Sequence, residues 1–178
     1  VDEERLTDAC RRILNAKFQL GIFENPYVDE DAVYDHVGTA EHKAIAKEAA
    51  ARSFTLVKYD NAAPLTGQKI VVAGSLAQNI RALNSGWTAK EPIEITGTTI
   101  LDALTAKAGA DNVTYVETAA DVPADLSGTT AIVVVGEKSG THDPEWTAAS
   151  LEFPQEQTEL VQALKAAGAN VVSVVIMN

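Results

Sequence analysis

The chain has 178 residues, enough for one domain or for one domain with an appendage. Apolar residues make up 46% of it and charged residues 22%, which excludes a disordered tail. The net charge of −11, without any cluster of lysines and arginines, argues against nucleic acid and membrane surfaces as partners.

The N-terminal part predicts one amphipathic helix followed by a linker. Leu6, Ile13 and Leu20 recur with alanines at steps of three and four, and Gly21 follows as a stop signal. Residues 22–38 carry Pro26 and several acids without a sustained period. We therefore expect two parts, residues 1–38 and 39–178. The first residue is valine, and we expect the sequence to be a piece of a longer protein.

The second part alternates short apolar segments with amphipathic ones. The segments expected as strands are residues 54–59, 69–74, 112–116, 131–135 and 171–176. The segments expected as helices are residues 39–52, 76–83, 99–108 and 154–167. Strands that are apolar on both faces, alternating with helices, predict an α/β fold with a doubly wound, mostly parallel sheet in flavodoxin-like layers. No apolar run approaches the roughly 20 residues that span a bilayer, so we expect a soluble chain of undetermined compartment.

Ligands of such sheets bind beyond the carboxyl ends of the strands, where the segments after Ala73, Val116 and Val135 emerge. The turn AGSLAQN after the first of these has one glycine, which fits neither a dinucleotide fingerprint nor a P-loop. Neither a nucleophile elbow nor a set of zinc ligands is present, so we expect no cofactor and no metal. His36 and His42 are interpreted as structural.

The segment VVVGEKSGTHDPEW, residues 133–146, is the strongest candidate for chemistry. It places His142, Asp143 and Glu145 beside Trp146 in a long loop after the most apolar strand. A carboxylic acid next to an aromatic ring is typical of a sugar site, where the ring stacks on the sugar and the acid protonates the leaving oxygen. Composition alone favours a solvated loop without a function, so a further observation is needed.

Separated segments, taken in order, closely resemble the glycoside hydrolase family 3 enzymes of the β-glucosidase type. These segments are RRILNAKFQLGIFENPYVD (11–29), EHKAIAKEAAARSFTLVKYDN (41–61), SGWT (85–88), GTTILDAL (97–104), IVVVGE (132–137) and LEFPQEQTELVQAL (151–164). Together they extend over nearly the whole chain.

The resemblance implies a catalytic (β/α) barrel, a linker and an α/β sandwich. Residues 1–38 are then the closing helix of a missing barrel plus the linker, and residues 39–178 an incomplete sandwich. Retaining glycosidases need a nucleophilic carboxylate and a second carboxyl that serves as acid and then as base. In the family the nucleophile is on the barrel and the acid/base on the sandwich loop. The chain would therefore supply only the acid/base loop and part of the leaving-group subsite.

The loop departs from the family pattern at the acid/base position. Typical members have G-E-x-P-Y-x-E, and the final glutamate of that motif falls on His142 here. We rank Glu145 first as the acid/base, His142 second and Asp143 third. Asp143 is also a candidate for binding substrate, and Glu137 is expected to anchor the loop.

The second departure concerns the tryptophans that bind the sugar. Typical members have G-G-W-T-x-x-W-Q-G, in which Trp87 matches the first tryptophan and Glu91 replaces the second. We expect Trp87 to bind substrate, with Trp146 as a candidate replacement for the missing ring.

Three functions stay open on the sequence. The chain can be a piece of a retaining β-glucosidase that is inactive alone, a stand-alone carbohydrate-binding module, or an assembly element that joins a barrel-bearing chain. Its ligand would be a β-glucoside or oligosaccharide. Exposure of the apolar N-terminal helix would favour self-association or a retained partner chain.

Overall fold

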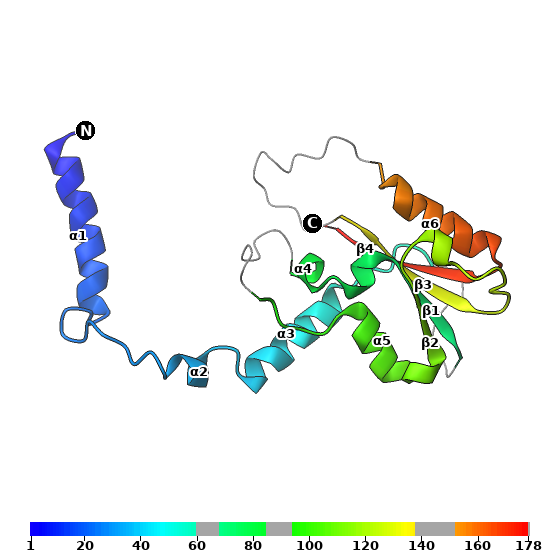
Figure 1. Ribbon diagram of the computed structural model, residues 1–178. Helices are drawn as coiled ribbons and strands as arrows, with labels where there is room; N and C mark the ends of the chain where they lie inside the picture. The colour runs from blue at the N-terminus through cyan, green and yellow to red at the C-terminus, as the bar shows by residue number, and fades with distance from the viewer. Residues whose placement is uncertain (60–67, 85–93, 138–151, 178) are drawn as a thin grey trace. The chain divides into compact units, whose positions relative to one another are not determined.

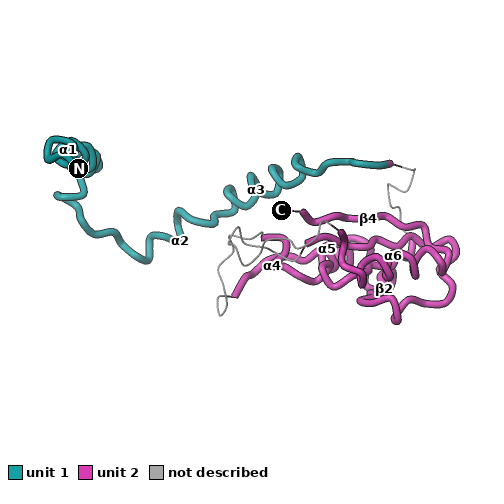
Figure 2. The backbone as a smooth tube through the Cα atoms, turned by 90° about the horizontal axis from the view of Figure 1, so that it is seen from above, with its two compact units in different colours: residues 1–58 teal, residues 59–178 magenta. Residues whose placement is uncertain are grey.

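A computed structural model describes residues 1–59, 68–84, 94–137 and 152–177 (Figure 1). The chain divides into two compact units, residues 1–58 and 59–178 (Figure 2). The domain division expected after residue 38 stays a prediction. No helix in the described ranges is long and apolar enough to cross a membrane.

The first unit contains three helices, α1 (Glu3–Gln19), α2 (Val33–His36) and α3 (Ala40–Ser53). The Asp2 carboxylate accepts a hydrogen bond from the Glu4 amide at the start of α1, and the Thr39 hydroxyl accepts one from His42 at the start of α3. Side-chain caps of this kind satisfy amides that have no partner within the helix. No residue of the three helices is buried.

Residues 54–59, expected to form a strand, are not a strand in the structure. Their backbone pairs with no strand among the described residues, and a strand requires a ladder of hydrogen bonds to a neighbour. Phe54, Leu56 and Val57 are exposed. The apolar pattern of this segment was therefore misleading about its local structure.

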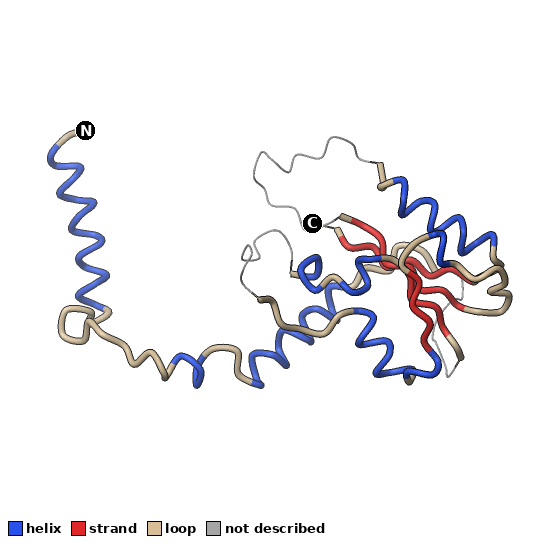
Figure 3. Tube along the Cα trace, viewed as in Figure 1, coloured by secondary structure: helices blue, strands red, loops and turns tan. Residues whose placement is uncertain are grey.

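The described part of the second unit is built on a parallel sheet of four strands in the order β2-β1-β3-β4 (Figure 3). These are β1 (Ile70–Ala73), β2 (Val113–Val116), β3 (Thr130–Gly136) and β4 (Asn170–Ile176). Ile70 of β1 pairs with Val113 on one side and with Thr130 on the other. The predicted doubly wound α/β fold is confirmed.

Alternate residues of the two central strands enter two separate cores, because successive side chains of a strand point to opposite faces. Val71 and Val133 pack against α6 (Gln155–Ala166), through Leu160 and Leu164. Val72 and Ile132 belong to the other core, with η1 (Ser75–Gln78), α4 (Ile80–Leu83) and α5 (Ile100–Ala108). Every residue of β1 and β3 is buried, which explains their unbroken apolar sequences.

The connections that follow the two central strands lie on opposite faces and lead to opposite edges of the sheet. The connection from β1 to β2 runs through η1, α4, α5 and η2 (Ala110–Asn112), whereas that from β3 to β4 includes α6, which packs in the other core. The connection from β2 to β3 contains η3 (Ala119–Asp121) and the buried Leu126 of the α6 core. In open α/β sheets this reversal opens a crevice at the carboxyl ends of the strands on either side of it. Here those strands are β1 and β3.

Candidate functional site

A cleft of about 430 Å³ lies at the carboxyl ends of β1, β2 and β3. It is therefore at the reversal point where such sheets bind ligands. Its walls come from the turn after β1, the turn after β2, and the first turns of α6. The lining residues are Gly74, Ser75, Glu117, Thr118, Ala119, Ala120, Val134, Glu156, Gln157, Glu159 and Leu160.

The wall after β1 depends on a glycine. Gly74 has a φ of +95°, and its amide donates a hydrogen bond of 2.9 Å to the Val116 carbonyl of β2. The Tyr115 hydroxyl donates a longer one, 3.4 Å, to the Gly74 carbonyl. Burial raises the pKa of the Tyr115 phenol, although a hydrogen bond with Gln78 opposes the shift. Tyr115 therefore stays a neutral donor and holds the turn against β2.

The wall after β2 is shaped by a local hydrogen-bonded box. Both the hydroxyl and the amide of Thr118 donate to the Asp121 carboxylate, at 2.7 and 3.0 Å. These two bonds, the hydroxyl first, lower the pKa of Asp121. The box fixes the backbone of Thr118, Ala119 and Ala120, which line the cleft.

The wall from α6 is tied to the end of β3 by a side-chain amide. The Gly136 amide donates to Oε1 of Gln157 at 2.9 Å, and Nε2 of Gln157 donates back to the Gly136 carbonyl at 2.9 Å. Gln157 is part-buried, and Leu160 and Leu164, one and two turns further along, seat the helix on the sheet. The contact therefore joins two rigid elements.

Gly136 is also closely confined on its other side. Its φ is +137°, and a Cβ atom there would collide with the backbone of Ile176 in β4. The amide of Glu137 donates to the carbonyl of Ile176 at 3.1 Å. The last residues of β3 are thus held between α6 and β4, at the point where the chain enters residues 138–151.

The cleft is rich in hydrogen-bond acceptors. Glu117, Glu156 and Glu159 bring carboxylates, and Ser75 and Thr118 add hydroxyl groups. Among the described residues that line it, none is lysine, arginine or histidine. This arrangement suits the hydroxyl groups of a neutral polar ligand and disfavours a phosphate.

All five residues predicted for the site lie outside the described residues. Trp87 belongs to residues 85–93, and His142, Asp143, Glu145 and Trp146 belong to residues 138–151. The described residues on either side of the second segment are Glu137 and Glu152. The roles assigned to the five residues remain predictions.

Sequence reasoning missed the role of Gln157, although a signal for it exists. Positions 157, 160, 161 and 164 follow the steps of three and four that mark one face of a helix, and the other three are leucine or valine. A glutamine on this apolar face predicts a buried polar partner. In the structure that partner is the Gly136 backbone.

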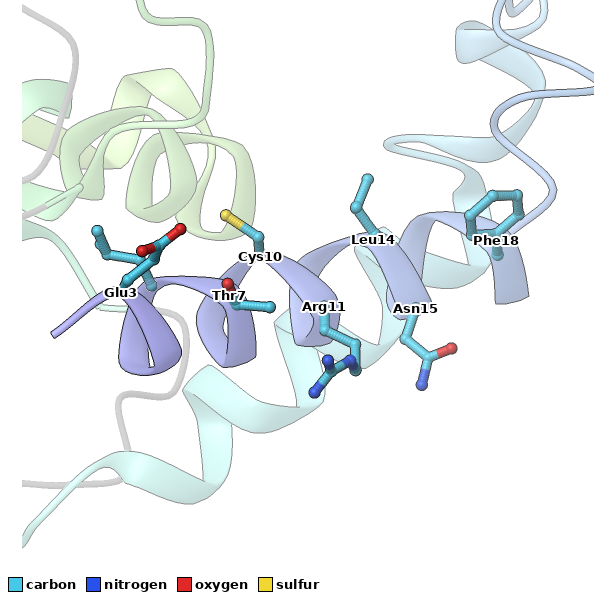
Figure 4. A pocket seen from close by; sticks show the side chains of 8 residues that line it. Glu3, Thr7, Cys10, Arg11, Leu14, Asn15 and Phe18 are labelled. Atoms are coloured by element: carbon cyan, nitrogen blue, oxygen red, sulfur yellow. The ribbon is translucent and has the colours of Figure 1, made fainter.

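A second hollow runs along α1 (Figure 4). Its lining residues are Glu3, Leu6, Thr7, Cys10, Arg11, Leu14, Asn15 and Phe18. All of them belong to one helix, so the hollow has no opposite wall within the described residues. The described residues also contain no group of three potential metal ligands.

Comparison with known proteins gives a consistent result. Residues 54–178 match the family model described as the glycosyl hydrolase family 3 C-terminal domain. The lysosomal beta glucosidase of Dictyostelium discoideum is 39% identical over 93 residues, which are 49% of this chain and 11% of that protein.

Solved structures agree with this chain in fold over nearly its full length. The exo-1,3/1,4-beta-glucanase of a Pseudoalteromonas species has a TM-score of 0.79 and 28% identity over 98% of this chain and 23% of that one. The beta-glucosidase of Listeria innocua in complex with glucose has a TM-score of 0.76 and 26% identity, over 98% of this chain and 25% of that one. The chain therefore spans at most a quarter of the length of these proteins.

Proposed function

Because the chain belongs to glycoside hydrolase family 3, with residues 54–178 as its C-terminal domain, we propose that it works as part of a retaining β-glucosidase. The reaction is hydrolysis of terminal, non-reducing β-D-glucosyl residues. This chain contributes the acid/base loop and part of the leaving-group subsite, and the nucleophile belongs to a barrel outside it. The similarity to beta-glucosidases over a small share of their length supports this division.

The observation that carries the proposal is the way in which the chain is held immediately before residues 138–151. That segment begins at the carboxyl end of β3, where Gly136 is held between α6 and β4 beside an acceptor-rich cleft. A proton donor works only if it reaches the glycosidic oxygen at hydrogen-bond distance. A rigidly held backbone just before the segment, at the edge of the sheet where ligands bind, supports such a position for the proton donor.

We assign the acid/base role to Glu145, with His142 and then Asp143 as the next candidates. In the first step this group protonates the leaving oxygen while the nucleophile attacks the anomeric carbon, and the glycosyl-enzyme forms. In the second step its conjugate base removes a proton from water, which hydrolyses the intermediate. Trp146 is proposed to stack on the sugar of the leaving group, and Trp87 and Asp143 to bind substrate.

The test uses the enzyme that contains this sequence. Each of the three acid/base candidates is substituted in turn, and the variants are assayed with aryl β-glucosides. Loss of the true acid/base slows substrates with poor leaving groups, whereas azide, which needs no base to attack the glycosyl-enzyme, restores turnover of activated ones. We expect this pattern for Glu145→Ala alone, normal rates for the His142 variant, and a raised KM without rescue by azide for the Asp143 variant. Turnover by the isolated chain at an ordinary enzymatic rate would contradict the placement of the nucleophile elsewhere.

The exposed apolar residues of α1 support a partner for this helix. Leu6, Ile13, Leu14 and Phe18 are all exposed, and large exposed apolar patches commonly mark interaction sites. We propose that the barrel-bearing remainder of the enzyme covers them, and that copies of the isolated chain associate through them instead. Mass spectrometry of the native assembly distinguishes the two partners.

A further inference from the structure

We propose that Gln157 is a positioning residue, which orients the acid/base loop through its hydrogen bonds to the backbone of Gly136. The inference rests on the function proposed above for residues 138–151. It assigns to α6 a part in catalysis without contact between Gln157 and substrate.

The first step of the argument is the hydrogen-bonding pattern at the end of β3. β1 pairs with β3 only as far as Ala73 and Val133, because the chain turns away at Gly74. β3 continues to Gly136, which is in register with Ile176 of β4. Among the described residues, the last residues of β3 after Val133 therefore have no strand beside them on the β1 side.

The second step is the direction of the backbone groups. In a parallel strand the amide and carbonyl of one residue point to the same neighbour, and those of the next residue point to the other. The Glu137 amide bonds to Ile176, so both groups of Gly136 point away from β4. Gln157 bonds to both of them and replaces the missing strand.

The third step is the rigidity of the helix that carries Gln157. In α6, Leu160 is 3% exposed and Leu164 is fully buried, so these two side chains fix the helix on the sheet. The paired donor and acceptor of Gln157 fix the plane of the Gly136 peptide groups as a strand would. Without the pair, Gly136 is held only by the pairing with β4, and because it has no Cβ its peptide groups can turn through a wider range, which changes the direction of the chain beyond it.

The consequence for catalysis follows from the direction of the chain. A rotation at residue 136 changes the direction in which the chain continues toward Glu145. A displacement of about 1 Å at the reacting groups can cost on the order of 100-fold in rate. Loss of Gln157 should therefore weaken proton donation and leave the nucleophile intact.

The experiment compares two substrates of the enzyme that contains this chain. Phenyl β-glucoside needs its leaving oxygen protonated, whereas 2,4-dinitrophenyl β-glucoside does not. We expect Gln157→Ala to lower kcat/KM for the phenyl substrate about 10- to 100-fold and for the dinitrophenyl substrate less than about threefold. Gln157→Glu, which keeps the acceptor and loses the donor, should fall between wild type and Gln157→Ala.

The matched control is Gln162→Ala. Gln162 lies on the same helix, is exposed and does not line the cleft. We expect wild-type values for both substrates. Thermal melting and titration of competent sites give the folded fraction of each variant.

Several results would overturn the inference. Equal loss on both substrates means that the contact maintains the fold rather than the proton donor, and unfolding of both Gln157 variants means the same. Unchanged rates mean that the loop is positioned without it. If the wild-type enzyme hydrolyses neither glucoside, the proposed function itself fails, and that outcome is distinct from these.

Discussion

The carbonyl oxygen of Val134 lies 2.5 Å from the position that a Cβ atom would take at Gly74. The two central strands thus approach too closely at the cleft for any residue other than glycine. We predict that Gly74→Ala lowers the free energy of unfolding by about 3 kcal/mol, from the left-handed backbone and the collision together.

Gly128→Ala is the control for this prediction. Gly128 also has a positive φ, +76°, but a Cβ atom added there would have no other atom within 4 Å, so only the backbone cost of about 1 kcal/mol should remain. Urea denaturation of both variants measures the difference. Equal losses would show that the close approach to Val134 has no energetic importance.

Leu164 anchors α6 to the sheet and is fully buried. We predict that Leu164→Ala costs about 2–5 kcal/mol of unfolding free energy, because it opens a cavity in the core beneath the helix. The exposed Gln162→Ala on the same helix should stay within about 0.5 kcal/mol of wild type. Denaturation midpoints of the two variants measure the difference. A loss of unfolding free energy in Leu164→Ala smaller than that in Gln162→Ala would contradict the assigned packing.

The Asp121 carboxyl should titrate below its ordinary range, with a lowered pKa, because Thr118 donates two hydrogen bonds to its ionised form. Since the folded pKa is the lower one, the stabilisation is complete above the unfolded pKa and is lost as the pH falls through the folded pKa. We predict that Thr118→Ala raises the pKa of Asp121 by removing the hydroxyl donor.

Nuclear magnetic resonance titration of the side-chain carboxyls tests this. Asp125 is the internal reference, because its pKa is lowered by Ser127 and should not change in the Thr118 variant. An unchanged pKa of Asp121 in Thr118→Ala would exclude the hydroxyl as the main cause.

The apolar residues of α1 should drive association of the isolated chain. Ile13 is 60% exposed and Phe18 is 61% exposed. We predict that sedimentation at rising concentration gives an apparent mass above that of the monomer, and that Ile13→Glu lowers it. Ala49→Glu on α3 adds the same charge to another exposed helix and should have no effect. A wild-type chain that stays monomeric would refute the proposal.

The fold of the second unit was largely predictable from the sequence. The apolar segments around Val72 and Val133 are buried on both faces, and such segments between amphipathic helices specify a parallel sheet. The prediction of a strand at residues 54–59 was wrong because the composition of this segment indicates only a preference for extended structure. Whether a strand forms depends on a partner, which local sequence does not identify.

The site was predictable only in its place on the sheet. The alternation of strands and helices predicted the carboxyl ends of the strands, after Ala73, Val116 and Val135, where the cleft lies. The bond between Gln157 and Gly136 joins residues 21 positions apart, and its geometry depends on how α6 packs. The position of Gln157 on an apolar helix face was the available signal.

The pair of hydrogen bonds between Gln157 and Gly136, at the end of β3, involves only main-chain atoms of β3. Gln157 contacts the amide and carbonyl of Gly136, and neither group depends on which side chains follow. The segment beyond can therefore exchange its reactive residues while its attachment stays the same. Grafting the corresponding segment of another enzyme between residues 137 and 152 should transfer that enzyme's proton donor onto an unchanged scaffold.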